Sequence, residues 1–140
     1  MASKIFLDAN ILLDFTLQRE EFSLAKKIIE QILEGNLKGF TTSSIIHIVG
    51  YWLSKSYGAA IAKDLLLNLL SDIKVIDISH EVVPLALHSK IIDIEDALQY
   101  YTALSHKMDV FISNDKQLKK VAMPVLPIYK AKEFVKILEI

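Results

Sequence analysis

The sequence of 140 residues has no cysteine, only four glycines and three prolines, and almost no net charge. Without cysteine the chain forms neither disulfide bonds nor thiolate metal sites, which fits a reducing compartment. The formal net charge of −1 excludes a strong overall field that attracts nucleic acid. Any nucleic-acid binding must therefore come from a local site.

Long apolar runs are also missing. No run approaches the roughly 20 residues that span a bilayer, and the N-terminus lacks the pattern of a signal peptide. Apolar residues nevertheless make up 52% of the chain and charged residues 24%, which is a globular composition. We expect a single soluble, cytoplasmic domain over residues 1–140 with no membrane partner, because this length suffices to bury a core.

Short apolar strands alternate with helical patterns along the chain. The expected strands cover residues 4–7, 40–42, 74–78, 110–113 and 125–127, and the expected helices cover 10–17, 23–34, 43–57, 59–70, 79–91, 95–107, 116–120 and 130–140. The expected helix caps are Ser23, Ser43 or Ser44, and Ser79. This alternation predicts an α/β fold, a three-layer sandwich with a central, mostly parallel sheet and helices on both faces.

Three aspartates fall at the carboxyl ends of the expected strands, where such sheets bind ligands. Asp8 ends the first strand, Asp115 follows the fourth, and Asp96 lies in the first turn of the helix between the third and fourth strands. Each alone has an ordinary interpretation, as a turn residue, a helix cap or a charge that complements a helix dipole. Together they favour a site for a hard divalent cation, magnesium or manganese, which prefers carboxylate and water oxygens.

Three runs of sequence resemble a known family. They are FLDANILLDFTLQRE at 6–20, DIEDALQYYTAL at 93–104 and DVFISNDKQL at 109–118. In order and spacing they are similar to the acidic motifs of PIN domains, and among these to VapC-like toxin ribonucleases. The resemblance covers nearly the full length of the chain.

The resemblance implies an endoribonuclease that depends on Mg²⁺ or Mn²⁺, cleaves single-stranded RNA, and is held by an antitoxin protein. Asp8, Asp96 and Asp115 would then be the catalytic metal ligands. The supporting residues would be Asn10, Ser43, Asp93, Glu95, Ser113 and Asn114. In such a site one or two cations lower the pKa of a bound water and stabilise the leaving oxygen. The apolar, Leu-, Ile- and Tyr-rich helices further predict a homodimer.

One acid that PIN domains usually carry is missing. It is often a glutamate on the helix after the second strand, but the stretch TSSIIHIVGYWL at 42–53 contains no carboxylate. By position Ile48 stands in its place, with His47 beside it. A histidine ligand suits manganese better than magnesium, whereas a surface histidine is the more ordinary outcome.

Three functions therefore remain open. The first is an active nuclease, and the second is a catalytically weakened or inactive PIN-like binding module, which the missing acid favours. The third is a phosphatase-like domain, because Asp8 follows the first strand as a nucleophilic aspartate does. It ranks last, since Asn10 stands where such enzymes carry a second acid. Lys116, Lys119 and Lys120 either guide a phosphate backbone or form a solvated helix face.

Overall fold

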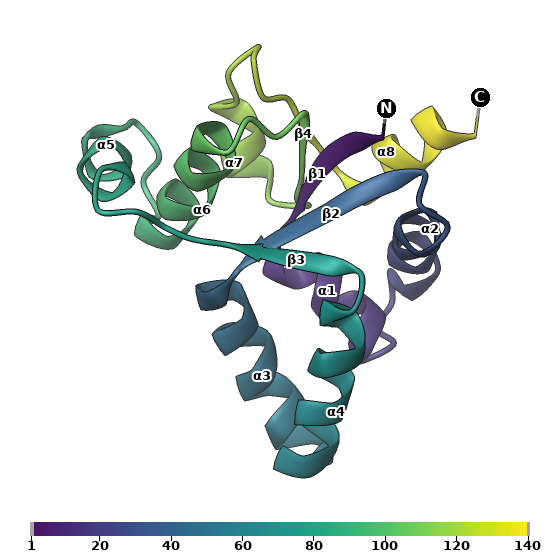
Figure 1. Ribbon diagram of the computed structural model, residues 1–140. Coiled ribbons are helices and arrows are strands. Elements are labelled where there is room, and N and C mark those ends of the chain that lie inside the picture. The colour runs from purple at the N-terminus through teal and green to yellow at the C-terminus, as the bar shows by residue number, and fades with distance from the viewer. Residues whose placement is uncertain (1, 140) are drawn as a thin grey trace.

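The computed structural model describes residues 2–139 as a five-stranded sheet between two layers of helices (Figure 1). The strands are β1 (Ser3–Leu7), β2 (Leu37–Thr42), β3 (Ile73–Ile76), β4 (Val110–Ile112) and β5 (Ile128–Tyr129). The helices are α1 (Ala9–Thr16), α2 (Phe22–Leu33), α3 (Ser43–Tyr57), α4 (Ala59–Leu70), α5 (Val82–His88), α6 (Ile94–Ser105), α7 (Lys116–Lys120) and α8 (Ala131–Leu138). The predicted three-layer α/β sandwich is confirmed.

The strand order is β3-β2-β1-β4-β5, and all neighbouring strands run parallel. From β1 the chain winds outward to β3, returns to the centre at β4 and winds outward again to β5. Right-handed crossovers therefore place α1–α4 on one face of the sheet and α5–α7 on the other (Figure 1). The neighbours β1 and β4 mark the switch point of the winding, where a crevice opens beyond the carboxyl ends of the strands.

Buried aromatic rings hold α6 over the centre of the sheet. Phe6 of β1 stacks on Phe111 of β4 with ring centroids 4.8 Å apart, and Tyr100 of α6 lies 5.5 Å from Phe111. The Tyr100 hydroxyl donates a hydrogen bond to the carbonyl oxygen of Leu126. On the opposite face, a Cβ at Gly39 would lie 2.6 Å from Cδ1 of Ile32, so the glycine lets α2 approach β2 closely.

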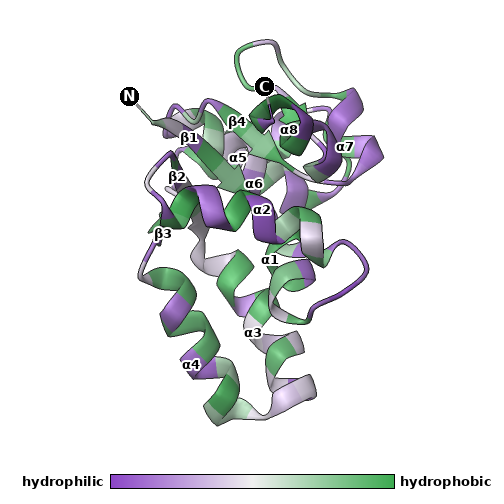
Figure 2. Ribbon diagram, turned by 90° about the vertical axis from the view of Figure 1, so that its right-hand side faces the viewer, coloured by the Kyte–Doolittle hydropathy of each residue, from purple (hydrophilic) through white to green (hydrophobic). Residues whose placement is uncertain are grey.

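Helices α3 and α4 form an antiparallel pair that projects away from the sheet (Figures 1 and 2). Figure 2 shows hydrophobic segments along both helices, and several of their large apolar side chains are exposed. These side chains are Tyr51, Trp52, Tyr57, Ile61 and Leu67. Within residues 2–139, no helix is both long enough and apolar enough to cross a membrane.

The last strand was predicted at the wrong residues. We expected residues 125–127, but β5 consists of Ile128 and Tyr129. The backbone N–H of Leu126 closes a turn on the carbonyl oxygen of Met123, which leaves Val125 exposed at the tip. Pro127 has no N–H to give to a ladder, although its carbonyl oxygen accepts from Phe111.

The expected serine caps were also wrong. The hydroxyl oxygen of Thr42, one residue earlier than expected, accepts the N–H of Ile45 and caps α3. Helix α2 begins at Phe22, before Ser23, without a side-chain cap, and the Phe22 ring stacks on Phe15 of α1. Ser79 precedes α5 by three residues, and its backbone oxygen, not its hydroxyl, accepts from that helix. Side-chain packing and backbone turns therefore set these helix starts.

Candidate active site

Asp8 leaves the sheet at the switch point, directly after β1. Its side chain is 8% exposed. Oδ1 accepts the backbone N–H of Ala9 and Oδ2 accepts the hydroxyl of Ser113, which follows β4, both at 2.8 Å. Because both oxygens of this buried carboxylate have donors, its burial costs less and its orientation is fixed. Asp8 is at the same time the N-cap of α1.

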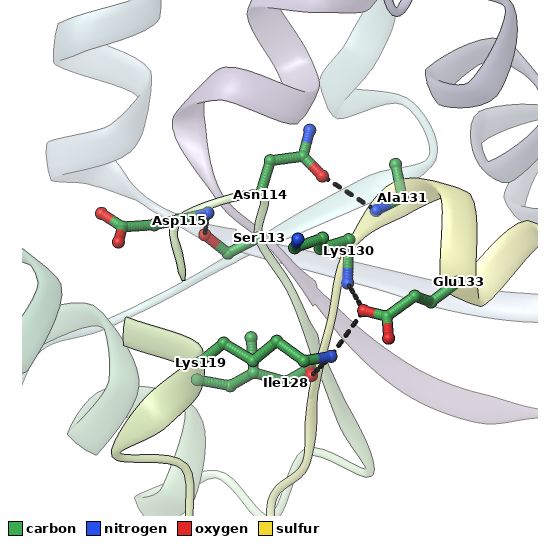
Figure 3. A network of polar contacts seen from close by, with 8 residues as sticks. All are labelled: Ser113, Asn114, Asp115, Lys119, Ile128, Lys130, Ala131 and Glu133. Atoms are coloured by element: carbon green, nitrogen blue, oxygen red, sulfur yellow. Dashed lines mark hydrogen bonds and ion pairs between the residues drawn. The ribbon is translucent and has the colours of Figure 1, made fainter. Parts of the chain in front are cut away.

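Ser113 also connects to Asp115. The backbone N–H of Asp115 donates to Oγ of Ser113 at 3.2 Å (Figure 3). Oδ1 of Asp115 accepts the N–H groups of Gln117 and Leu118, so Asp115 caps α7. Figure 3 shows the Asp115 carboxylate pointing away from Lys119 and its neighbours. The charge of Asp115 is nevertheless felt at Asp8, where it contributes to a raised pKa.

The first turn of α6 brings further acids to the crevice. Oδ1 of Asp93 accepts the N–H of Asp96 at 2.9 Å and caps the helix, and Glu95 and Asp96 lie in its first turn. An open cavity of about 840 Å³ separates this turn from α7. Its lining comprises Lys90, Ile91, Ile92, Asp93, Ile94, Glu95, Asp96, Asp115, Gln117, Leu118, Lys120 and Val121. We name Asp8, Asp93, Glu95, Asp96 and Asp115 the acid cluster.

The negative charges of the acid cluster act on one another. Burial raises the pKa of Asp96 to about 7, and repulsion from the other four acids contributes to the rise. In decreasing order of effect these acids are Asp8, Asp93, Asp115 and Glu95. A proton is therefore retained at Asp96 near neutral pH unless a cation compensates the charge.

The pKa values of Asp8 and Glu95 are raised as well. Burial raises the pKa of Asp8, although the hydrogen bonds from Ser113 and Ala9 oppose the change. Burial, followed by the charges of Asp8 and Asp93, raises the pKa of Glu95. The residues that share this electrostatic coupling lie directly after β1, at the start of α6 and at the start of α7.

The donor chemistry of the acid cluster fits a hard divalent cation, since its five carboxylates form no ion pair within residues 2–139 and repel one another. As the side chains stand, however, no three His, Asp or Glu residues within 2–139 form a group that can hold a metal ion. Side-chain rotation would be needed to bring carboxylate oxygens into one coordination shell of about 2.0–2.6 Å. Joint binding of a cation by Asp8, Asp96 and Asp115 stays a prediction.

Asn10 lies beside a residue that the sequence did not suggest. It is exposed, and the guanidinium of Arg19 donates both to its side-chain oxygen, at 3.2 Å, and to its backbone oxygen, at 3.3 Å. Arg19 also forms an ion pair of 2.8 Å with the buried Asp14. Asn10 is thus tied to Arg19, and Asp14 serves to hold this arginine.

Asn114 and Ser43 are two further residues that the sequence predicted as supporting the site. Oδ1 of Asn114 accepts the backbone N–H of Ala131, which ties β4 to the start of α8 (Figure 3). Ser43 is exposed at the first position of α3. The lysines of α7 differ from one another, because Lys119 is paired with Glu133 whereas Lys120 lines the cavity beside the acid cluster.

The position of the missing acid contains no substitute ligand. Ile48 is half-buried and packs against the hydrophobic core. His47 is exposed and lines a separate cavity between α3 and α4, together with Gly50 and Lys63, and no member of the acid cluster lines that cavity. His47 therefore faces away from the predicted metal site.

A neutral hydrogen-bond network links α3 to α6 near the acid cluster. The Thr42 hydroxyl donates to Oε1 of Gln99 at 2.6 Å, and Nε2 of Gln99 donates to the hydroxyl of Ser44. Gln99 is buried one turn after Asp96. The sequence analysis missed it, although a glutamine three residues after an acid on one helix face is a recognisable signal.

Fold and site together define an α/β protein with an acidic crevice at the switch point of its parallel sheet. The family model described as PIN domain matches residues 4–117, and the chain belongs to this family. The resemblance noted in the sequence is thereby confirmed. No curated protein matches the chain.

Solved structures of similar fold include VapC toxins. VapBC2 from Rickettsia felis, bound to a DNA fragment from its promoter, is 19% identical with a TM-score of 0.66, covering 91% of this chain and 98% of its own. The Mycobacterium tuberculosis toxin VapC20, which cleaves the sarcin-ricin loop, is 12% identical with a TM-score of 0.66, covering 85% and 95%. A toxin-antitoxin complex from Klebsiella pneumoniae is 22% identical with a TM-score of 0.64, covering 87% and 94%. At these identities the likeness shows the shared fold.

We predict that the metal-free protein loses stability as the pH rises. The pKa of Asp96 is about 7 in the folded chain, against an ordinary value of 3.8. Between these values the folded chain keeps a proton that the unfolded chain releases, so the free energy of unfolding falls with increasing pH. The raised pKa values of Asp8 and Glu95 act in the same direction. Urea unfolding with a chelator, repeated across this interval, measures the effect.

The variant Asp96→Asn tests the origin of this pH dependence, because asparagine does not titrate. We expect the free energy of unfolding of the variant to fall less steeply with pH and to exceed that of the wild type near pH 7. Glu133 acts in the opposite direction at the low end of the interval, because the hydrogen bond from Lys119 lowers its pKa from the ordinary 4.5. Its stabilising contribution is complete above that value, so the fall between about pH 5 and 7 reports the acid cluster. A wild-type stability that rises across the interval would contradict the electrostatic account.

Proposed function

We propose that residues 1–140 act as one PIN-like domain that cleaves single-stranded RNA with Mg²⁺ or Mn²⁺, as the toxin of a toxin-antitoxin pair. The acid cluster at the switch point carries this proposal, because its carboxylates raise one another's pKa where a divalent cation would relieve the repulsion. Asp8, Asp96 and Asp115 are the proposed catalytic ligands. Asp93 and Glu95 add negative charge at the rim.

The surrounding residues have distinct roles in this proposal. When bound, the cation supplies an activated water and neutralises charge on the phosphodiester. Ser113 holds the Asp8 carboxylate in one orientation through its hydroxyl. Lys90 and Lys120, on the lining of the cavity, attract the phosphate backbone. Ile92 and Ile94, both exposed beside the acids, offer an apolar surface to a ribose or base.

An antitoxin is the protein partner that we propose. An apolar cavity of about 490 Å³ lies between α1, α2 and α4, away from the acid cluster. Phe15, Phe22, Ile29, Leu33 and Leu65 are among its lining residues. This surface suits an apolar segment of an antitoxin that folds as it binds. The cytoplasm is the proposed compartment, since a ribonuclease meets its RNA there.

A catalytically weakened or inactive binding module is the second candidate. The observation that favours it is the absence of a carboxylate at residues 42–53, where Ile48 packs against the core and Thr42, Gln99 and Ser44 form a neutral network one turn along α6 from Asp96. With one acid fewer, the electrostatic attraction for a divalent cation is weaker. The two candidates therefore differ in cation affinity at the same crevice.

We predict that Asp8→Asn removes the cleavage of a fluorescently labelled single-stranded RNA in Mn²⁺ or Mg²⁺. The oxygen of asparagine can still accept the N–H of Ala9 and its NH2 group can donate to the Ser113 hydroxyl, so the fold should persist, but the charge that attracts the cation is removed. The loss should be roughly 100-fold or more, because the cation contributes several kcal/mol. Asp64→Asn, at an exposed position on α4, is the matched control and should leave the rate unchanged. Equal cleavage by both variants would place the activity outside the acid cluster.

Ile48→Glu tests the missing acid. If Ile48 stands at the site, the new carboxylate strengthens cation binding and raises cleavage, so Mn²⁺ should increase the melting temperature more than in the wild type. Without metal the variant should be less stable, since it buries a charge at a half-buried position. His47→Glu adds the same charge one residue away, on the side of α4, and should gain no metal effect. A folded Ile48→Glu protein without metal response or cleavage would favour the binding module.

We further predict a homodimer in which the exposed aromatic side chains of α3 are covered. Tyr51 is 50% and Trp52 48% exposed, and their rings meet edge to face 5.2 Å apart. Aromatic side chains of this kind are enriched at subunit contacts. Sedimentation equilibrium should give twice the chain mass, and Trp52→Glu should shift it toward the monomer. Val125→Glu, at an exposed apolar loop position, should remain dimeric. A wild-type monomer at all concentrations would exclude the dimer.

A further inference from the structure

Three lysines lie together at the amino-terminal end of the sheet, opposite the end with the acid cluster. Lys4 of β1 stands in register with Lys38 of β2, and Lys74 of β3 stands in register with Phe40 of β2. Alternation along the strands places Phe40 and the three lysines on one side of the sheet. With His106, directly after α6, they line an open cavity of about 410 Å³. We name these five residues the lysine face.

No ion pair within residues 2–139 neutralises the lysines of this face. Within residues 2–139 the ion pairs involve Arg19, Lys27 and Lys119, and none involves a residue of the lysine face. The nearby Asp109 accepts the backbone N–H of Lys4 and not its ammonium group. Like charges on neighbouring strands destabilise a sheet. An anionic ligand would offset this repulsion.

The lysine face is also accessible. Lys38, Lys74 and His106 are exposed, and Lys4 and Phe40 are half-buried. In Figure 1 the first residues of β2 and β3 lie clear of α5 and α6, which are drawn toward the arrowhead end of these strands. Phe40, Ile76 and Met108 supply the apolar part of the cavity lining. A ligand can therefore reach both the charges and an aromatic ring.

Lysines arranged around an aromatic ring on an open sheet match the chemistry of single-stranded nucleic acid. Ammonium groups attract successive backbone phosphates, and any base can stack on an aromatic ring. An acidic peptide would use the charges but would have no specific use for the ring of Phe40. The charge pattern and the ring together favour RNA over a peptide.

We propose that the lysine face binds single-stranded RNA, with phosphates at Lys4, Lys38 and Lys74 and a base stacked on Phe40. This inference rests on the proposed function in so far as it takes RNA as the substrate class. Lys4 and Asp8 belong to the same side of the sheet and are roughly 13 Å apart along β1. Helix α6 packs over the sheet between these two ends, so the lysine face is a binding surface separate from the acid cluster.

Fluorescence anisotropy with a labelled oligouridylate tests this surface. All variants carry Asp8→Asn, so that binding is measured without cleavage, and affinity is followed against salt concentration. Replacing Lys4, Lys38 and Lys74 with alanine should weaken binding and reduce the slope of log affinity against log salt by about 2, since each phosphate contact contributes about 0.7. The control replaces Lys63, Lys132 and Lys136, which are exposed and unpaired within the described chain. It removes the same charge and should leave the slope unchanged.

Phe40→Leu separates stacking from charge, because leucine keeps apolar volume and removes the ring. Its affinity for RNA should fall roughly tenfold with an unchanged salt slope. Equal effects of the two triple variants would overturn the proposal. The proposal would also be overturned if polyglutamate competed as well as RNA of equal charge and Phe40→Leu had no effect. The surface would then be a site for an acidic peptide. Binding at the lysine face in a chain whose wild type never cleaves would support this inference and refute the nuclease.

Discussion

The hydrogen bond from Ser113 to Asp8 joins the carboxyl ends of β1 and β4, and the arrangement of the crevice depends on it. It is possible because the winding of the chain reverses between these two strands, which makes residues 105 positions apart immediate neighbours. A buried carboxylate at this point needs donors on both oxygens. Ala9 and Ser113 supply them, and the helices that follow each strand start from the same place.

The charges of the molecule are separated along the strands. All neighbouring strands run parallel, so the acids that follow β1 and β4 gather at one end, while Lys4, Lys38 and Lys74, early in their strands, gather at the other. Helix α6 runs between the two ends, with Asp96 in its first turn and His106 directly after its last. The formal net charge of −1 conceals this separation.

The sequence predicted those features that depend on local pattern. Alternating strands and helices implied the parallel sheet, and acids directly after apolar strands implied the acidic edge, since the carboxyl ends of parallel strands meet. The motif runs identified the family. Prediction failed where a tertiary contact competed with a local signal: Thr42, held by Gln99 of a distant helix, caps α3 in place of the serines after it, and the turn at Met123–Leu126 displaces the last strand.

The sequence by itself determined the α/β class, the membership of the PIN family and the identity of the acids, because strand length, helix periodicity and motif order are properties of the chain. Only the tertiary structure decided what surrounds those acids. Burial and repulsion between acids from distant segments raise the pKa of Asp96. Asn10 accepts a hydrogen bond from Arg19, and Lys119 forms an ion pair with Glu133. It also aligned three lysines from three strands. These are consequences of packing, since each requires residues far apart in the chain to meet in a particular register.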